Sequence, residues 1–445
     1  MKRNVRRPSI VVTTGGAGVV AHAGARLLCE LADSLGLSDA LSEAMAPTKQ
    51  RRRGHDRGQV LVDMAVAIAD GATTLSDMRV LGDQPDLFGD VASTPTMWRT
   101  LQATDAVALG RIEAARANAR AAAWAAGMDP GFYVVDIDAT LVNAHSDKEG
   151  AAPNYKHGFG FQPMVAFLDA TGEALAAILR PGNAAAGSAE DHVRLLDAAL
   201  AQLPVDPMAS EVIVRTDSAG ASHGFVDACR ARGVRFVVGH RLSADLAALV
   251  VGIPKSRWSS TISADGTEER DAGMVAEVTD LVDLSSWPEG TRMLVRREEP
   301  HPGAQLTFSD VDGHRYQLFI TDHPEGDVAF LEALYRGRGR CERRICDAKD
   351  TGLENLPSAS FAINEAWLAL VLIASDLLAW LRALCLEGAL QKAEPKRLRY
   401  TLLHSAGILV RSARRTTLRI AAGWPWGDDL VAAFGRLPGW MPATT

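Results

Sequence analysis

Residues 132–140 read FYVVDIDAT, and this stretch decides the fold of the 445-residue chain. Its apolar side chains predict a buried β-strand, and the two-residue period of a strand places Asp136 and Asp138 on the same face. The opposite face carries Tyr133, Val135 and Ile137. A carboxylate at the end of an apolar strand is costly unless it is solvated, paired or bound to a metal. The end of this strand is therefore a candidate site.

A second apolar stretch repeats the pattern. Residues 211–216 read EVIVRT and are followed directly by Asp217. If the two strands are neighbours in a sheet, Asp138 and Asp217 converge at one sheet end. The alternative for each aspartate alone is that it caps the turn that follows its strand.

The elements around these strands predict a mixed α/β sheet. The order from Gly131 is three strands, a helix, a strand, a helix and a strand, which is not the strict alternation of a doubly wound fold. Asp169-Ala170-Thr171-Gly172 is a turn signal, and Ser188 with Asp191 predicts a helix start. The strands are predicted at 132–138, 160–168, 174–179, 211–216 and 234–238, and the helices at 188–203 and 222–232.

The chain divides into five predicted segments. Residues 1–130 are mainly helical, with helices around 58–70, 74–81, 95–102 and 105–127, and residues 131–240 hold the first part of the sheet. Residues 241–326 are a β-rich insertion with strands at 274–278, 292–296, 305–308 and 316–320. Residues 327–390 return to helix, including a long apolar helix at about 362–386, and residues 391–445 form a basic C-terminal region. The fold class expected outside the sheet is therefore an N-terminal helical domain and a C-terminal helical region.

The N-terminal segment contains a glycine-rich stretch of the kind found in dinucleotide-binding sites. Residues 9–14 read as a short strand, and Gly15-Gly16-Ala17-Gly18 then leads into a helix that ends near Leu35. A dinucleotide site also needs a second strand that ends in an acid about 20 residues further on. The chain there is rich in Ser, Lys and Arg, so the sequence disfavours a dinucleotide. A DNA-recognition domain and a helical domain with a solvated basic tail both remain open.

A third group of polar residues lies between Gly326 and Pro357. Tyr335, Arg338, Glu342 and Lys349 are spaced by three, four and seven residues, which places them on one face of a single helix. A carboxylate inside a basic helix suits a site that binds a metal ion and the polyanion that it activates. An exposed, salt-bridged helix is the alternative, and Gly337 and Gly339 weaken the helix prediction.

These residues carry a resemblance to a known family. Tyr335-x2-Arg338-x3-Glu342-x6-Lys349 resembles the Y-R-E-K signature of bacterial insertion-sequence transposases with a DDE active site. Residues 138–140 are similar to the group's first-carboxylate motif and residues 216–217 to its second, and the β-rich stretch before Glu342 matches its inserted β domain. Residues 15–35, 58–63 (GQVLVD) and 96–99 (TMWR) resemble the thirteen-eighty family within that group.

The resemblance implies a ribonuclease-H-like (retroviral-integrase-like) catalytic core. Asp138, Asp217 and Glu342 would be the catalytic residues and would hold two Mg²⁺ ions, for which Mn²⁺ is expected to substitute. One ion would activate a water or a 3′-hydroxyl, and the other would stabilise the leaving oxygen. The implied function is a transposase that binds the terminal inverted repeats of its own element, cleaves phosphodiester bonds and inserts the element by strand transfer.

The resemblance also implies roles for other residues. Arg338 and Lys349 would contact phosphates near the cut, and Tyr335 would brace the terminal nucleotide. Asp136 is the rival of Asp138 for the first ligand, and Asp138 is preferred because the Asp-Ala-Thr triplet carries the match. Some relatives form a DNA hairpin and stack a flipped base on an aromatic ring of the inserted β domain. Trp258 and Trp287 are the candidates for this stacking here, and the alternative is that they pack in the core of the insertion.

Two other functions remain as alternatives. A structure-specific ribonuclease-H-like nuclease or resolvase would cut DNA that lacks any repeat and would show no strand transfer. A non-catalytic DNA-binding descendant of a transposase would not need the intact trio Asp138, Asp217 and Glu342. Inverted repeats flanking the coding region would favour the transposase.

The distribution of charge is more informative than its sum. Lys and Arg total 47 and Asp and Glu total 54, so the net charge of −7 alone argues against a nucleic-acid partner. Residues 1–60, however, hold ten basic and five acidic residues, residues 335–349 six and two, and residues 392–419 eight and one. This distribution fits a protein that contacts DNA locally despite its acidic total. The resemblance implies that the partner is double-stranded DNA, at transposon ends and at the target, with a homodimer in the DNA complex.

The remaining features concern the compartment. Five cysteines form no paired framework, which favours a reducing cytoplasm over secretion. The most apolar stretch, residues 366–375, is about half a membrane span and is closed by Asp376. We expect a soluble protein of the cytoplasm, associated with the nucleoid and with no membrane partner.

Overall fold

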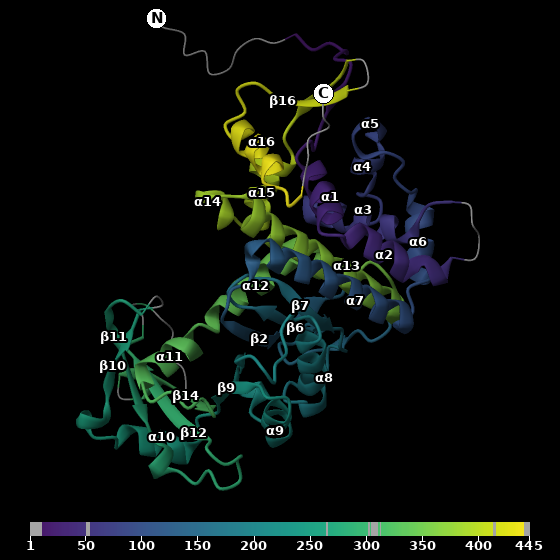
Figure 1. The fold of residues 1–445 in the computed structure, drawn as a ribbon. Helices are drawn as coiled ribbons and strands as arrows, with labels where there is room; N and C mark the ends of the chain where they lie inside the picture. The colour runs from purple at the N-terminus through teal and green to yellow at the C-terminus, as the bar shows by residue number, and fades with distance from the viewer. Residues whose placement is uncertain are drawn as a thin grey trace, which may run out of the picture.

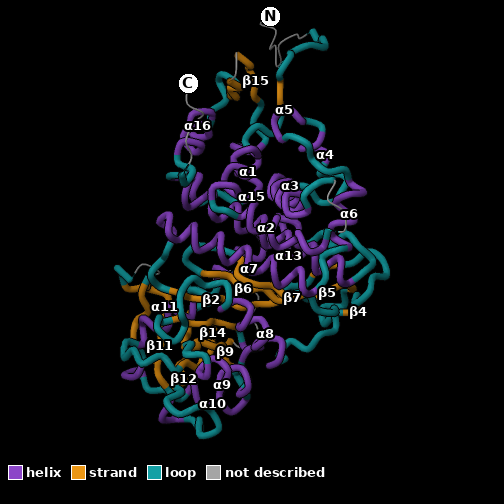
Figure 2. The backbone as a smooth tube through the Cα atoms, turned by 45° about the vertical axis from the view of Figure 1, so that its right-hand side comes forward, coloured by secondary structure: helices purple, strands orange, loops and turns teal. Residues whose placement is uncertain are grey.

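The computed structural model describes residues 11–49, 54–263, 266–300, 303, 310–311, 313–412 and 415–439, except the side chains of residues 271 and 272. Figure 1 shows a β-rich lobe at the lower left, a layer of long helices in the middle, and the C-terminal segment beside the N-terminal helices at the top. The central sheet and the helical layer lie against each other in both views (Figure 2).

Five strands form the centre of the molecule. In spatial order they are β7 (Ala174–Ile178), β6 (Met164–Leu168), β2 (Tyr133–Ala139), β8 (Val212–Thr216) and β9 (Arg235–His240). β6 is antiparallel to β2 and β7, whereas β8 is parallel to β2 and β9. Helix α8 (Ala189–Leu200) leads from β7 to β8, and α9 (His223–Ala231) leads from β8 to β9. The fold is mixed α/β, in the predicted order of elements.

Local signals in the sequence explain two details of this core. The Ser188 side chain accepts a hydrogen bond from the Asp191 backbone N–H, so α8 begins where its predicted cap placed it. The single strand predicted over 160–168 is wrong, because the chain divides at Gln162-Pro163 and proline has no N–H for the ladder. β5 (Phe159–Phe161) belongs instead to a small sheet with β3 (Val142–Asn143) and β4 (Ala152–Pro153).

The predicted insertion continues the central sheet. β14 (His314–Thr321) pairs with β9 in antiparallel fashion, so the described residues form one ten-stranded sheet. The predicted strand at 305–308 lies outside the described residues. The other elements here are α10 (Ala244–Val251), η4 (Lys255–Arg257), β10 (Ser259–Ile262), β11 (Glu269–Glu277), η5 (Thr279–Leu281), β12 (Arg292–Glu298) and β13 (Asp310–Val311).

The two faces of the central sheet have different covers. One face, with Val135 and Val214, belongs to the large core shared with the helical layer. The other face, with Val134, Ile213 and Val237, packs against Leu331 and Leu334 of α11 (Val328–Arg336). Asp136 and Asp138 follow Val134 at two-residue intervals, so they lie on the face that α11 covers.

Helix α13 (Phe361–Trp380) is the centre of the helical layer. With η7 (Leu381–Cys385) it is long and apolar enough to cross a membrane, but 72% of its most apolar window is buried inside the fold, as in the core helix of a globular domain. The helices α1 (Ala25–Ser34), α3 (Arg57–Asp70), α6 (Thr94–Gln102) and α7 (Ala106–Ala123) pack on it. The other elements of the N-terminal part are α2 (Leu37–Met45), η1 (Ala46–Thr48), α4 (Arg79–Gly82), α5 (Pro85–Phe88) and η2 (Trp124–Met128).

A buried ionic network joins this layer to the sheet. The guanidinium groups of Arg116 and Arg120 on α7 each donate to Asp376 of α13 at 2.8 Å, and Arg120 also donates to Glu173 beside β7 at 3.1 Å. The Asp376 carboxylate in turn accepts from the Ala174 backbone N–H at 3.0 Å. These charges are tolerated without solvent because each has partners on two elements.

The terminal segments differ from their prediction. Residues 11–14 form no regular strand, and β1 (Val19–Val20) follows the glycines instead. β1 pairs with β15 (Gly407–Ser412), which pairs with β16 (Arg415–Ile420), so the basic C-terminal region contains a β-hairpin rather than helices alone. In β16, Arg415, Thr417 and Arg419 alternate with Thr416, Leu418 and Ile420, a strand period that the charge count obscured. The other elements here are α14 (Gly388–Gln391), α15 (Pro395–Leu398), η8 (Arg399–Leu403) and α16 (Gly427–Gly435).

Candidate active site

Asp138 and Asp217 lie at the same end of two adjacent strands. β2 and β8 are parallel neighbours in which Asp136 stands opposite Arg215. Asp138 and Asp217 each follow two residues later, so both point to the same face at the same sheet end. The Asp217 side chain also accepts from the Ala219 backbone N–H at 2.9 Å, so it caps the turn η3 (Ser218–Gly220). Convergence and turn capping, posed as alternatives from the sequence, occur together at this residue.

The two aspartates of β2 have different environments. Asp136 is buried, and both of its carboxylate oxygens accept hydrogen bonds at 2.7 Å from the guanidinium of Arg215. Asp138 is half-buried and lies where the strand ends. A carboxylate held by two hydrogen bonds from a buried arginine is structural, whereas Asp138 retains access to the solvent.

Arg215 is the residue that sequence reasoning missed. Besides Asp136 it pairs with Asp169 at 3.0 Å, and its Nη1 donates to the backbone carbonyl of Leu334 on α11 at 2.7 Å. It therefore connects β2, β8 and α11 from inside the protein. The signal was present in VIVRTD, because an arginine inside an otherwise apolar strand must find a buried partner on the same sheet face.

The helix predicted to carry Tyr335, Arg338, Glu342 and Lys349 is two helices. α11 ends at Arg336, and α12 (Gly339–Ala348) begins after Arg338, with Lys349 in the wider turn η6 (Lys349–Leu353). The break is explained by a contact from a residue that is distant in the sequence. Arg215 occupies the Leu334 carbonyl, and the Arg338 N–H bonds to the carbonyl of Tyr335 instead.

Gly337 makes this approach possible. A Cβ atom at Gly337 would lie 2.3 Å from Nη1 of Arg215, whereas a Cβ at Gly339 would meet open space. One of the two glycines that weakened the helix prediction is therefore required by packing, and the other is not.

Arg338 connects the candidate carboxylates. Its Nη1 donates to Oδ2 of Asp138 at 3.0 Å, and its Nη2 lies 3.9 Å from Oε1 of Glu342. Glu342 is exposed on the first turn of α12. Burial raises the pKa of Asp138, Arg338 opposes that shift, and the charges of Asp217 and Glu342 add to it. The charges of Asp217 and Glu342 are thus close enough to affect the pKa of Asp138.

Tyr335 lies beside Asp217. Its ring stacks on Phe319 of β14, with ring centroids 4.5 Å apart. A Cβ at Gly239 on β9 would lie 2.8 Å from the Tyr335 hydroxyl and 2.9 Å from the Ser218 backbone nitrogen, so this glycine lets the hydroxyl approach the end of β8. Burial raises the pKa of Tyr335, which keeps the phenol protonated.

Lys349 has no contact with Asp138, Asp217 or Glu342 among the hydrogen bonds and ion pairs of the described residues. Its ammonium donates to the backbone carbonyl of Leu141, just after β2, at 2.9 Å, and it lies 3.6 Å from Glu354. The structure therefore attaches Lys349 to the loop that follows Asp138. Arg338 and Tyr335, in contrast, lie beside the candidate carboxylates.

The two tryptophans considered for base stacking lie in packed surroundings. Trp258 is buried in the β-rich lobe, and the guanidinium of Arg297 covers its ring at 4.1 Å. Trp287 is half-buried against His223, with ring centroids 4.3 Å apart. Both rings have protein contacts of the kind that a core residue makes.

The donor set of the site suits a hard cation. Carboxylate oxygens are the ligands that Mg²⁺ prefers, and here they come from β2, the end of β8 and α12. They do not converge on a single point, because among the described residues only a histidine-containing trio elsewhere has its ligand atoms within 4.8 Å of one another. The guanidinium of Arg338 lies between Asp138 and Glu342 and supplies positive charge there.

Comparison with known proteins identifies relatives of the whole chain. Residues 2–441 match the family model described as Transposase DDE domain, group 1. No curated protein matches the sequence. One similar solved structure is the cryo-EM structure of a piggyBac transposase synaptic complex with hairpin DNA, with 10% identity over 84% of this chain and 80% of that chain and a TM-score of 0.44. At this similarity no residue of that structure is carried over to this one.

Proposed function

The chain belongs to the group 1 transposase DDE domain family and is thus a transposase, an enzyme that cleaves phosphodiester bonds, and on this premise we propose that Asp138, Asp217 and Glu342 form its active site. In this proposal the enzyme binds the terminal inverted repeats of a bacterial insertion sequence of the thirteen-eighty type. It cleaves the DNA at those ends and inserts the element by strand transfer, in the cytoplasm at the nucleoid.

One observation carries the proposal. The parallel pairing of β2 with β8 brings Asp138 and Asp217 to one sheet end, and Arg338 joins that end to Glu342. The sequence separation of these residues is large, so only this topology brings them together. The order β7-β6-β2-β8-β9, three antiparallel strands extended by two parallel ones, supports a ribonuclease-H-like core.

The metal requirement follows from the donors. Asp138, Asp217 and Glu342 would hold two Mg²⁺ ions, with Mn²⁺ as a substitute. When bound, these ions supply an activated water or 3′-hydroxyl and stabilise the leaving oxygen. Asp136 is not among the proposed ligands, because both of its oxygens are occupied by Arg215.

Arg338, Tyr335 and Lys349 would contact the bound DNA. In the free protein Arg338 neutralises Asp138, and a phosphate near the cut offers it a second anionic partner. Tyr335 is held by Phe319 and carries a protonated hydroxyl that can donate to a phosphate or sugar oxygen. Lys349, which is anchored beside β2, would add positive charge to the backbone of the bound strand.

The proposed partner is double-stranded DNA at the element ends and at the target. Exposed arginines on the hairpin, Arg411, Arg415 and Arg419, offer phosphate contacts remote from the carboxylates. Two ends must meet before they are joined to a target, so we propose a homodimer in the DNA complex.

A strand-transfer assay tests the function. The purified protein is incubated with labelled DNA that carries the inverted repeat of its element, with Mg²⁺ and a supercoiled target plasmid. The proposal predicts cleavage at the repeat and a labelled product joined to the plasmid. Cleavage of DNA lacking the repeat, with no joined product, would instead support a structure-specific nuclease.

A further inference from the structure

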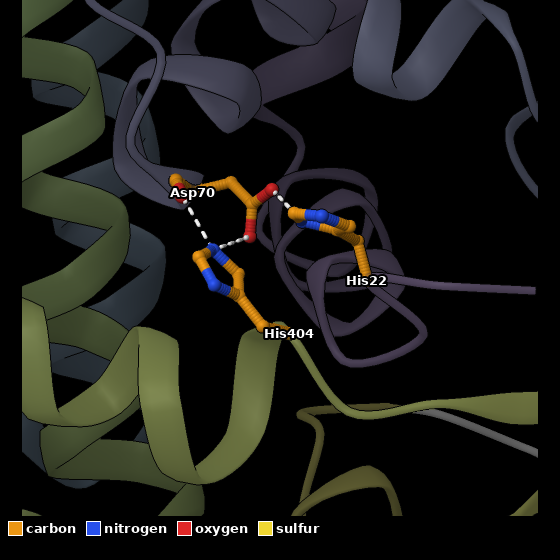
Figure 3. Close-up of side chains that lie close together, drawn as sticks. All are labelled: His22, Asp70 and His404. Carbon is orange, nitrogen blue, oxygen red and sulfur yellow. Dashed lines mark hydrogen bonds and ion pairs between the residues drawn. The ribbon is translucent and has the colours of Figure 1, made fainter. Parts of the chain in front are cut away.

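Three polar side chains meet in the helical layer, on elements separate from the proposed catalytic carboxylates. His22 lies between β1 and α1, Asp70 is the last residue of α3, and His404 follows η8. The carboxylate of Asp70 is directed towards a nitrogen of each imidazole ring (Figure 3), and the two ring centroids are 4.4 Å apart. Nδ1 of His22 is 2.5 Å from Oδ2 of Asp70, and Nε2 of His404 is 3.3 Å from Oδ1. One potential ligand atom from each residue lies within 4.8 Å of the others.

The carboxylate in this cluster is under-satisfied. The side chain of Asp70 is 1% exposed, and its buried Oδ1 accepts no hydrogen bond among the described residues. Nε2 of His404 bonds instead to the backbone carbonyl of Asp70 at 2.8 Å. Asp70 also ends α3, where the helix dipole makes a negative charge unfavourable. A cation at this position would be a partner for Oδ1 of Asp70 and would also interact favourably with the negative end of the α3 dipole.

The backbone is arranged to bring the ligands together. His22 has a φ of 54°, a left-handed conformation that is costly for a residue with a Cβ. Such conformations persist where the surrounding structure or a ligand requires them. Arg399 is the other charged group that faces the cluster, and its guanidinium is committed to the backbone carbonyls of Ala69 and Asp350 at 2.9 and 2.7 Å.

We propose that His22, Asp70 and His404 form a second metal site, which binds a divalent transition ion of the Zn²⁺ type. Two imidazole nitrogens and one carboxylate oxygen are a donor set that Zn²⁺ favours over Mg²⁺. The side chain of His404 is 41% exposed, so a water molecule can complete a tetrahedral coordination. The site would fasten the N-terminal segment and the C-terminal hairpin to α3, and its role is structural.

The competing occupant of the cluster is a proton. The Asp70 carboxylate beside it raises the pKa of His404, although burial opposes the shift. A protonated His404 would neutralise Asp70 without any metal. A metal and a proton compete for the same nitrogen.

The test uses the full-length protein, stripped of metal and titrated with Co²⁺ and Zn²⁺ in the presence of excess Mg²⁺. The proposal predicts one tightly bound ion per chain, the visible absorption of tetrahedral Co²⁺, and a higher Tm with Zn²⁺. His404→Gln and Asp70→Asn should weaken Zn²⁺ binding by more than about 10–100-fold, the usual cost of losing an outer partner of a metal ligand. Exposed His145 is the matched control, and His145→Gln should bind as the wild type does.

X-ray absorption of the Zn²⁺-loaded wild type decides the case even if the variants fail to fold. Two imidazole nitrogens in the first shell support the site, since the proposed catalytic trio contains no histidine. Coordination of Zn²⁺ by sulfur, or by oxygen alone, would overturn the proposal. Failure of the protein to bind Zn²⁺ in the presence of excess Mg²⁺ would also overturn it.

Discussion

Two aspartates on one strand face, two residues apart, have different environments because of a single arginine. Arg215 takes both oxygens of Asp136, and Asp138 lies beyond its reach at the strand end. The sequence predicted the strand, the shared face and the convergence with Asp217. It did not distinguish the two aspartates by geometry, because the partner of Asp136 lies 79 residues further along the chain.

Asp138→Asn should raise the Tm of the metal-free protein at neutral pH. Burial and the neighbouring carboxylates raise the folded-state pKa of Asp138 above its unfolded value, so the charged form costs folding free energy. Since the native state then binds the proton more tightly, stability increases as the pH falls through the folded pKa towards the lower unfolded pKa, and it is lost as the pH rises through the same window.

Thermal unfolding from pH 4 to 8, with and without Mg²⁺, measures this effect. The wild type should gain stability from Mg²⁺, and Asp138→Asn should lose that gain together with part of the pH dependence. Asp227→Asn, which changes an exposed acid on α9, is the control and should follow the wild type. A variant that still gains the full Mg²⁺ stabilisation would remove Asp138 from the proposed ligands.

Arg215→Met should destabilise the fold by about 3–5 kcal/mol, because it leaves the buried Asp136 without its charge partner. Urea unfolding followed by circular dichroism measures the change, with the exposed Arg241→Met as control. The double variant Arg215→Met/Asp136→Leu should recover part of the loss, since it removes the uncompensated charge. Equal stability of Arg215→Met and the wild type would show that Arg215 has no structural role.

At the scale of elements, local patterns predicted most of the core. Alternation and turn residues identified β2, β7, β8 and β9, and the cap at Ser188 identified α8. The predictions failed where a distant contact overrides the local pattern. Arg215 divides the helix predicted around Tyr335 and Lys349. In the basic C-terminal segment the charge count hid the strand pattern of β15 and β16, which pair with each other at six positions, whereas β1 pairs with β15 at two.

The two glycines beside Arg338 provide a matched pair of variants. Gly337→Ala should lower both stability and DNA cleavage, because its Cβ would lie 2.3 Å from Arg215 Nη1 and would displace the α11–α12 junction. Gly339→Ala adds a Cβ in open space within α12 and should be neutral or stabilising by about 0.5–1 kcal/mol.

Urea unfolding and cleavage rates of the two proteins give the comparison. The variants share the substitution and the neighbourhood, so a difference between them isolates the contact with Arg215. If the two behaved alike, the steric account of the helix break would be wrong.

At the scale of the whole molecule, charge is segregated. The basic residues of the hairpin lie on a three-stranded sheet beside the helical layer, whereas Asp138, Asp217 and Glu342 lie at the end of the central sheet. A net charge of −7 is therefore compatible with DNA binding. The sequence located the basic segments, but it could not show how they are placed relative to the carboxylates, because that depends on the packing of α13 and the terminal segments.

Binding to end DNA should weaken steeply as salt increases, and Arg415→Ala and Arg419→Ala should each reduce the slope of log K against log salt by about 1. Both side chains are exposed on β16, so their loss should not affect folding. Fluorescence anisotropy with labelled end DNA at several salt concentrations measures the slopes. Slopes unchanged from the wild type would exclude the hairpin from the DNA-binding surface.

The most direct test of the proposed active site is the single-turnover cleavage rate of labelled end DNA with Mg²⁺ for Asp138→Asn, Asp217→Asn and Glu342→Gln. Loss of groups that only orient metal ligands typically costs about 10–100-fold, so loss of a ligand should reduce cleavage by at least about 100-fold while the folded protein still binds the DNA. Asp227→Asn should cleave at the wild-type rate. Wild-type cleavage by Asp217→Asn or Glu342→Gln would contradict the assignment of the active site.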